Sequence, residues 1–170
     1  EKWQDHVRPG NWPDSDMLPL GKVGKHFGQE RDCLFTKEEQ KTMMTLWCIF
    51  GSPLMLGAEM TMLDEWTLSL LQNEELLDLH NHRFTGRQVL RDNEKCVWAA
   101  IDPASGEYFV ALFNLLDIPQ DVSVSTKDCA TPFPGAEFSA GHYREVWSGT
   151  ASEQLQGTVA PHGVLLFHKK

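Results

Sequence analysis

RPGNWPDSDML, residues 8–18, is the stretch that says most about the fold and function of this chain. It places two carboxylates, Asp14 and Asp16, two residues apart, with Trp12 and Met17 beside them, after a Pro-Gly turn. On an extended segment, residues two apart point to the same side. Carboxylates beside an aromatic ring suit a sugar, because its hydroxyls need charged acceptors and its C–H face needs an apolar surface. Taken alone, these residues fit a surface turn equally well.

The 170-residue chain has an ordinary globular composition, with 41% hydrophobic residues, and a formal net charge of −9. Nucleic-acid binding needs clustered Lys and Arg, which this sequence does not contain, so we expect no nucleic-acid partner. No apolar run approaches the roughly 20 residues that span a bilayer, so we expect no membrane partner. The sequence leaves the localisation open.

The first half of the chain is predicted to be mainly helical. Thr36 followed by Glu39 forms a capping box, which starts a helix at about Lys37. Apolar residues then follow the i, i+3, i+4, i+7 spacing of a helix that ends at Gly51. These residues are Met43, Leu46, Trp47 and Phe50.

Three shorter segments follow this helix. PLMLG, residues 53–57, is bounded by Pro and Gly and fits a strand buried on both faces, as in a parallel barrel. A second helix is expected next, with Thr61 and Asp64 as candidate caps, and a third begins near Asn73. The residues expected on the inner side of the second helix are Leu68 and Leu71.

From about Gly86 the pattern changes to β-strands rich in Val, Phe, Tyr and Trp. The first three are expected over 87–91, 95–101 and 107–115, with a turn at 102–106. Further strands are expected near 121–125, 143–147 and 163–168, with a loop over 131–141. Residues 109–113, FVALF, are apolar on both faces, which suits a central buried strand.

The sequence indicates neither a metal site nor a redox centre. The four cysteines are widely spaced, with no C-x-x-C, and Cys48 lies in an apolar helical pattern that predicts a buried thiol. His80 and His82 form the tightest histidine pair, but residues two apart on a helix do not face each other. No Cys or carboxylate at the usual spacing completes a zinc set. We therefore expect no metal and no cofactor, and His162 is expected in a turn.

The opening stretch resembles the end of strand seven in the (β/α)8 barrel of glycoside hydrolase family 27, the α-galactosidases and α-N-acetylgalactosaminidases. The family pattern there is close to PGGWNDPDML. The residues that match it without a gap are Pro9, Gly10, Trp12, Asp14, Asp16, Met17 and Leu18, and those that depart from it are Asn11, Pro13 and Ser15.

The resemblance continues in order through nearly the whole chain. The matching segments are FTKEEQ (35–40), LW (46–47), SPLM (52–55), LDEWTLSLLQNEELL (63–77), YREVWSG (143–149) and VAPHGVLLF (159–167). One departure is LHNHR, residues 79–83, where the family has an Asn-Gln pair. The resemblance implies an α/β part followed by an all-β part. Residues 1–84 would be the last strands and helices of a (β/α)8 TIM barrel, and residues 85–170 a C-terminal antiparallel β-sandwich domain.

The resemblance also implies which residues meet the substrate. The counterparts of Asp16 and Met17 line the galactose pocket at the C-terminal end of the barrel. We therefore expect Asp16 to accept hydrogen bonds from sugar hydroxyls, with Met17 packed beside it. Trp12 is expected to stack on the sugar or to anchor the loop. Asp14 is expected to cap a turn near the site.

In the family, the nucleophilic Asp lies on the fourth barrel strand and the acid/base Asp on the sixth. Residues 1–8 leave no room for either strand, so this chain is expected to contain neither catalytic residue. It would be the C-terminal portion of a retaining glycosidase that hydrolyses terminal α-D-galactosides or α-N-acetylgalactosaminides. Its expected partners are this substrate and either the missing N-terminal half of the barrel or a second copy. A partial barrel would expose the apolar sides of Met43, Trp47, Leu54 and Leu56.

Two other functions fit parts of the sequence. A non-catalytic carbohydrate-binding β-module would need aromatic residues exposed on one strand face, which the two-sided apolar strand at 109–113 disfavours. A metal-dependent glycosyltransferase would use Asp14 and Asp16 to hold a divalent ion and a nucleotide sugar. That function predicts a preceding nucleotide-binding domain.

Overall fold

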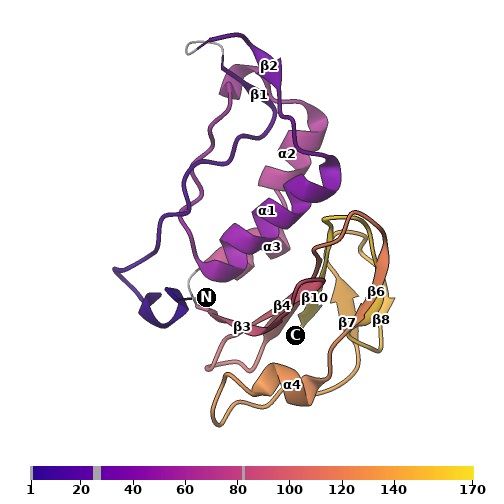
Figure 1. The fold of residues 1–170 in the computed structure, drawn as a ribbon. Coiled ribbons are helices and arrows are strands. Elements are labelled where there is room, and N and C mark those ends of the chain that lie inside the picture. The colour runs from indigo at the N-terminus through magenta and orange to yellow at the C-terminus, as the bar shows by residue number, and fades with distance from the viewer. Residues whose placement is uncertain (1, 25–27, 82) are drawn as a thin grey trace.

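The computed structural model describes residues 2–24, 28–81 and 83–170. Helices from the first half of the chain stand on a large antiparallel sheet formed by the second half (Figure 1). The helices are α1 (Lys37–Phe50), α2 (Glu65–Leu71), α3 (Glu74–His80) and α4 (Thr126–Ala130), with 3-10 turns η1 (Gln4–His6) and η2 (Met60–Met62). The strands are β1 (Lys22–Val23), β2 (Arg31–Asp32), β3 (Thr85–Arg91), β4 (Lys95–Ile101), β5 (Tyr108–Asn114), β6 (Gln120–Ser123), β7 (Tyr143–Glu145), β8 (Ala151–Ser152), β9 (Gln156–Val159) and β10 (Val164–Lys169).

Helix α1 begins and ends where the sequence predicts. The hydroxyl of Thr36 accepts a hydrogen bond from the N–H of Glu39, whose carboxylate accepts one from the N–H of Thr36. This completes the capping box. Gly51 ends the helix with a φ of 75°, a left-handed conformation that glycine adopts without strain. Cys48 is buried, which confirms its prediction as a buried thiol.

The next two helices differ from the prediction only in detail. The carboxylate of Asp64 accepts a hydrogen bond from the N–H of Thr67, so Asp64 and not Thr61 caps α2. The fully buried residues of α2 are Thr67 and Leu70, whereas Leu68 and Leu71 are half-buried. The fully buried residues thus each precede an expected one by one position. Helix α3 begins next to Asn73, as predicted, and the side chain of Asn73 caps it.

Residues 53–57 do not form the two-sided buried strand that the sequence predicts. Leu56 forms a single parallel bridge with Leu18, in which the N–H of Leu18 donates to the carbonyl of Met55 (2.7 Å) and the N–H of Gly57 to that of Leu18 (2.8 Å). Met55 is 52% exposed. The prediction of burial on both faces was wrong because, in the described ranges, this one bridge supplies the segment's sheet-like pairing. With α1 between them, the two segments still form a β–α–β arrangement.

The second half of the chain forms a six-stranded antiparallel sheet in the order β3-β4-β5-β10-β7-β8, and β6 pairs with β9 separately. The hairpin of β4 and β5 matches the prediction, with Asp102–Gly106 as its turn. All seven residues of β5 are buried, because this strand lies between β4 and β10 and both of its faces are covered. The prediction of a central buried strand is therefore confirmed.

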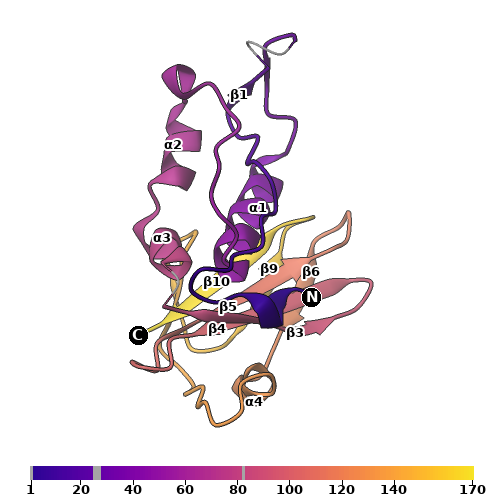
Figure 2. The ribbon, with the colours of Figure 1, turned by 90° about the vertical axis from the view of Figure 1, so that its left-hand side faces the viewer.

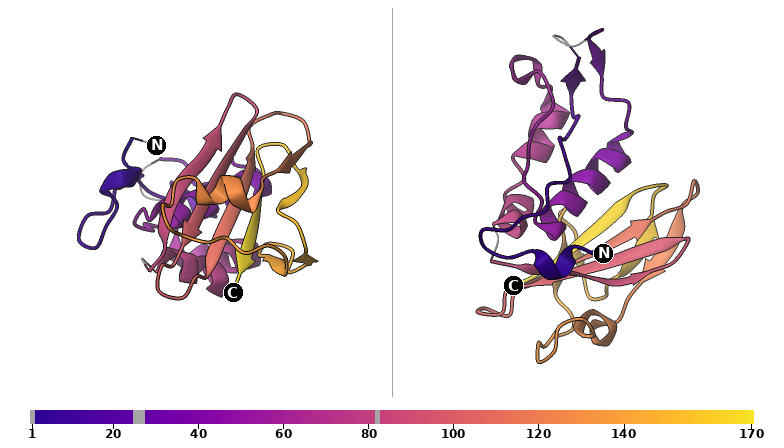
Figure 3. Two further views of the ribbon diagram at one scale, coloured as in Figure 1. Left: turned by 90° about the horizontal axis from the view of Figure 1, so that it is seen from below. Right: turned by 60° about the vertical axis from the view of Figure 1, so that its left-hand side comes forward.

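Alternate residues of the central strands enter two different cores. The helices α1 and α3 cover one face of the sheet, while α4 and the pair β6–β9 cover the other (Figures 2 and 3). The core under the helices takes Trp98, Ala100, Phe109, Ala111, Phe113 and Leu166, and the opposite core takes Val97, Ala99, Val110, Leu112 and Phe167. This period of two is what a sheet covered on both faces requires.

The helical layer and the sheet are in close contact at Gly86. A Cβ atom at this position in β3 would lie 1.9 Å from the carbonyl oxygen of Ile49, near the end of α1. A residue without a side chain is therefore needed for β3 to pass under α1. Within the described ranges, no helix combines the length and the apolar composition needed to cross a membrane.

Candidate functional site

The segment that carries the candidate residues is held in an irregular conformation. Arg8 and Asn11 exchange backbone hydrogen bonds around a turn in which Gly10 has a φ of 83°. Asp16 has a φ of 71°, in the left-handed region that non-glycine residues rarely adopt and that costs on the order of 1–3 kcal/mol. The alternation of a regular strand therefore does not apply across Asp16. Strained residues of this kind gather at functional sites.

Every backbone N–H from Ser15 to Leu18 has a hydrogen-bond acceptor. The donors and acceptors are Ser15 N–H to the Ser52 hydroxyl (2.9 Å), Asp16 N–H to Asp14 Oδ1 (2.9 Å), Met17 N–H to Asp16 Oδ1 (2.6 Å) and Leu18 N–H to the Met55 carbonyl (2.7 Å). Asp14 thus forms a turn through its side chain, two residues before the amide that it binds. These bonds fix the path of the chain through the strained residue.

The carbonyl of Asp16 accepts a hydrogen bond from helix α1. The indole N–H of Trp47, on α1, donates to this oxygen at 3.0 Å. Trp47 is half-buried and packs against the core beneath the helices. The strained residue is therefore tied to the helix that connects the two bridged segments.

Asp16 and Met17 lie on the surface, next to the bridge between Leu18 and Leu56. Met17 is 54% exposed and Met55, across the bridge, is 52% exposed. A Cβ atom at Gly57 would lie 3.1 Å from the Cβ of Met17, so these two segments are in close contact. Met43, Trp47, Leu54 and Leu56, which we expected to be exposed, are half-buried. They pack against the core under the helices, so their apolar sides are exposed only in part.

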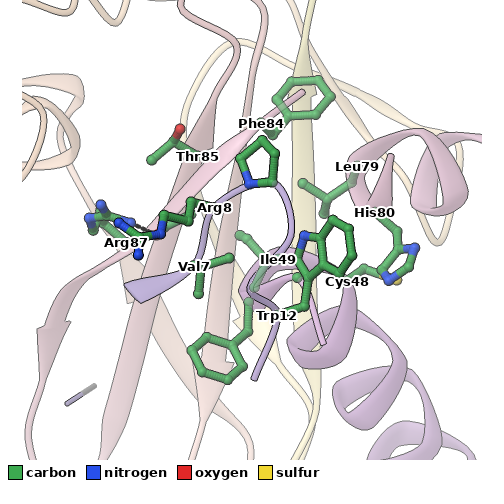
Figure 4. A pocket seen from close by; sticks show the side chains of 14 residues that line it. Val7, Arg8, Trp12, Cys48, Ile49, Leu79, His80, Phe84, Thr85 and Arg87 are labelled. Atoms are coloured by element: carbon green, nitrogen blue, oxygen red, sulfur yellow. Dashed lines mark hydrogen bonds between the residues drawn. The ribbon is translucent and has the colours of Figure 1, made fainter. Parts of the chain in front are cut away.

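Trp12 lies in a pocket between the helical layer and the sheet (Figure 4). This cavity of about 210 Å³ is lined by the N-terminal segment, the ends of α1 and α3, and the start of β3. Figure 4 shows the indole of Trp12 close to Leu79 and His80. The lining includes neither Asp14, Asp16 nor Met17. The structure therefore joins Asp14, Asp16 and Met17 through hydrogen bonds along one segment, and places Trp12 in the lining of this pocket.

Within the described part of the chain, no group of three or more His, Cys, Asp or Glu side chains is arranged to hold a metal ion. His80 Nε2 lies 2.8 Å from the carbonyl of Ser52, and His82 lies outside the described residues. The four cysteines are free, and burial raises the pKa of Cys48 well above its usual range. His162 occupies a turn with a φ of 51°.

The sequence did not single out Trp47 and Ser52 as residues of this site. Both occur in segments of the family resemblance, LW and SPLM, but no spacing rule connects them with residues 15 and 16. Their side chains reach the site only because α1 returns the chain alongside the first segment. The one signal available was that the family resemblance includes both segments together with the candidate stretch.

Two family models match the chain. The model described as alpha galactosidase A matches residues 1–82, and the model of the alpha galactosidase C-terminal beta sandwich domain matches residues 92–168. A curated relative, the probable alpha-galactosidase D of Aspergillus oryzae, is 30% identical over 171 residues, which are 93% of this chain and 23% of the relative.

Solved structures show the same relationship. A GH27 β-L-arabinopyranosidase from Geobacillus stearothermophilus is 42% identical, with a TM-score of 0.85 over 98% of this chain and 39% of that chain. A variant of it in complex with arabinose is 44% identical, with a TM-score of 0.86. A putative α-N-acetylgalactosaminidase from Bacillus halodurans is 36% identical, with a TM-score of 0.85 over 99% of this chain and 41% of that chain. The chain thus spans between about a quarter and two fifths of these proteins, and the expected fold class is confirmed.

Proposed function

This chain belongs to the alpha-galactosidase family, glycoside hydrolase family 27, and from this premise we propose that it is the C-terminal portion of a retaining glycosidase. Its substrates are terminal α-D-galactosides or pyranosides of the same ring configuration. The observation that carries the proposal is Asp16, a strained residue held by hydrogen bonds beside the Leu18–Leu56 bridge. In a (β/α)8 barrel, such strand ends carry the substrate site.

Asp16 is the residue that binds the sugar. An ionised carboxylate accepts up to about four hydrogen bonds, so the bond from the Met17 amide leaves capacity for sugar hydroxyls. The exposed side chain of Met17 packs beside the ring, and Asp14 supports the turn. Trp12, which is 41% exposed, offers a ring face to a more distant part of the substrate.

Asp16 is neither the nucleophile nor the acid/base. We assign those two carboxylates to a part of the protein that precedes this chain, where retaining hydrolysis needs them about 5 to 5.5 Å apart. Residues 1–84 then belong to the catalytic barrel and residues 85–170 to the C-terminal β-domain. The end of α3 at His80 and the start of β3 at Thr85 support this boundary.

The surface around the bridge contacts the rest of the barrel. Large apolar side chains are exposed there on both bridged segments, Met17 at 54% and Met55 at 52%, and Leu34 is 86% exposed before α1. Exposed apolar surface of this kind marks an interaction site. Without the preceding half of the barrel, this surface joins a second copy of the chain.

A second substrate class has support of its own. The highest identities among the structures above, 42% and 44%, are to a β-L-arabinopyranosidase and its arabinose complex. β-L-Arabinopyranose has the ring configuration of α-D-galactopyranose and lacks only the C6 hydroxymethyl group. An Asp16 that binds ring hydroxyls would serve both sugars.

A non-catalytic carbohydrate-binding β-module has less support. Such a module stacks sugars on exposed aromatic rings, whereas the aromatic residues of β4 and β5 are buried in the two cores. These residues are Trp98, Tyr108, Phe109 and Phe113.

The test is hydrolysis of three nitrophenyl glycosides by the 170-residue chain and by the full-length product of its gene. The glycosides are the α-D-galactopyranoside, the α-N-acetylgalactosaminide and the β-L-arabinopyranoside. We expect activity only in the full-length product, and the preferred glycoside names the sugar. No hydrolysis of any of the three by the full-length product would contradict the proposal.

A further inference from the structure

Trp47 is the side chain that connects the strained Asp16 to a helix. Its indole N–H donates to the Asp16 carbonyl at 3.0 Å across 31 residues of sequence. An indole N–H only donates, and a half-buried ring packed on the core holds that donor in one direction.

The other bonds along this segment come from the segment itself or from the neighbouring loop. Asp14 and Asp16 bind amides one or two residues away, while Ser52 binds Ser15. Local side-chain bonds of this kind form in several turn conformations. The hydrogen bond from Trp47 instead requires the Asp16 carbonyl to face α1. It therefore selects one of these turn conformations, the one in which Asp16 is left-handed.

We propose that Trp47 is a positioning residue that fixes the direction of the Asp16 carboxylate by holding the backbone of Asp16 in its left-handed conformation. This inference rests on the proposed function of Asp16 in sugar binding. If the indole N–H is lost, Asp16 relaxes toward the extended region and its side chain turns away from the sugar.

The first test compares Trp47→Phe with Trp147→Phe in the full-length protein. Trp147 is a matched control, because its indole N–H also donates a hydrogen bond, to the Thr45 hydroxyl on α1 at 3.1 Å, and its ring packs on the same core. We expect Trp47→Phe to lower kcat/KM for the preferred glycoside about tenfold, the usual value of one well-placed hydrogen bond, and Trp147→Phe to leave it unchanged. Equal effects of the two changes would overturn the proposal.

The second test separates positioning from a purely structural role. In a protein that already carries Asp16→Ala, we expect Trp47→Phe to have no further effect on kcat/KM, because Trp47 acts through Asp16. Additive losses would overturn the proposal. If Trp47→Phe does not fold, 3-benzothienylalanine at position 47 keeps the bicyclic shape of the ring and lacks only the N–H.

The third test does not depend on activity. Hydrogen exchange of the Met17 amide, which is bonded to Asp16 Oδ1, reports the local conformation directly. We expect this amide to exchange at least about tenfold faster in Trp47→Phe than in Trp147→Phe. An unchanged rate would overturn the positioning role. If the full-length protein hydrolyses none of the three glycosides, the proposed function fails and this exchange measurement still decides the role of Trp47.

Discussion

The Nε2 atom of His168 lies 2.6 Å from a carboxylate oxygen of Glu107, and Nδ1 of the same ring lies 2.9 Å from Glu75 on α3. The ring is 2% exposed and stacks on Phe109 with the ring centroids 4.0 Å apart. Glu107 directly precedes β5 and Glu75 lies on α3, so the ring contacts carboxylates from two separate elements. This residue of β10 therefore joins the helical layer to the sheet.

Replacing His168 with Gln is expected to reduce the free energy of unfolding by about 2 kcal/mol at neutral pH. The change removes the ring-nitrogen contacts of two partly buried carboxylates, which keep their bonds to Arg83 and Arg144. Urea unfolding measures the effect. His142→Gln is the control, since His142 also pairs with a glutamate, Glu153, but is 86% exposed, so little change is expected there. Similar losses in both variants would contradict this role of His168.

The contacts of His168 with Glu75 and Glu107 predict that the folded state loses stability in acid. Burial raises the pKa values of Glu75 and Glu107, but hydrogen bonds from His168, Arg144 and Arg83 outweigh it and hold both below their ordinary value of 4.5. A carboxyl whose pKa is lowered by folding stabilises the folded state above pH 4.5, and this stability is lost as the pH falls through the folded value.

Unfolding by urea at several pH values between 7 and 3 checks this expectation. The unchanged chain should lose more free energy of unfolding than His168→Gln over the acid part of the range, because the variant already lacks the contacts of His168 with Glu75 and Glu107. If the free energy of unfolding depends on pH in the same way in both proteins, the contacts of His168 do not cause the loss of stability in acid.

Gly86→Ala is expected to destabilise the fold by more than about 3 kcal/mol, because a Cβ atom there would overlap the Ile49 carbonyl at 1.9 Å. The obstacle is backbone, so a side-chain rotation cannot relieve it. Thermal unfolding followed by circular dichroism measures the loss. The neighbouring Thr85→Ala, at an exposed position, is the control and should shift the midpoint only slightly. A thermal midpoint for Gly86→Ala close to that of Thr85→Ala would contradict this prediction, because it would mean that the helices and the sheet can move apart without loss of stability.

Asp16→Asn is expected to lower kcat/KM of the full-length protein by about 10- to 100-fold without changing its thermal midpoint. Asn adopts the left-handed conformation as readily as Asp, so the change removes the charge and spares the backbone. Kinetics with the preferred nitrophenyl glycoside give the result. Asp121→Asn, at an exposed position on β6, is the matched control and should retain full activity. Unchanged kinetics for Asp16→Asn would remove this residue from the site.

The 170-residue chain is expected to associate with itself through the apolar surface beside the bridge. Light scattering after size exclusion should give a mass above that of one chain, and Met55→Gln should shift the distribution toward the monomer, because Met55 is 52% exposed there. Ile118→Gln, which changes a 63% exposed residue of the β-domain, should leave the mass unchanged. A monodisperse monomer for the unchanged chain would contradict the assignment of this surface.

Much of the fold was predictable because its signals are local. The capping box of Thr36 and Glu39, the terminating Gly51 and the two-sided apolar β5 each depend on residues within a few positions of one another. The segment at 53–57 was misjudged because its burial depends on neighbours that its own sequence does not describe.

The sequence by itself determined the three helices α1 to α3, the main hairpin, the family and the candidate carboxylates, but not the short helix α4. Only the tertiary structure decided that Trp47 bonds Asp16 across 31 residues and that His168 joins Glu107 and Glu75 across 61 and 93 residues. It also decided that Trp12 lines a pocket whose lining does not include Asp16. The physical reason is that propensity and periodicity act between chain neighbours, whereas a strained backbone or a buried charge is stabilised by partners that only the packing of distant elements brings within hydrogen-bond distance.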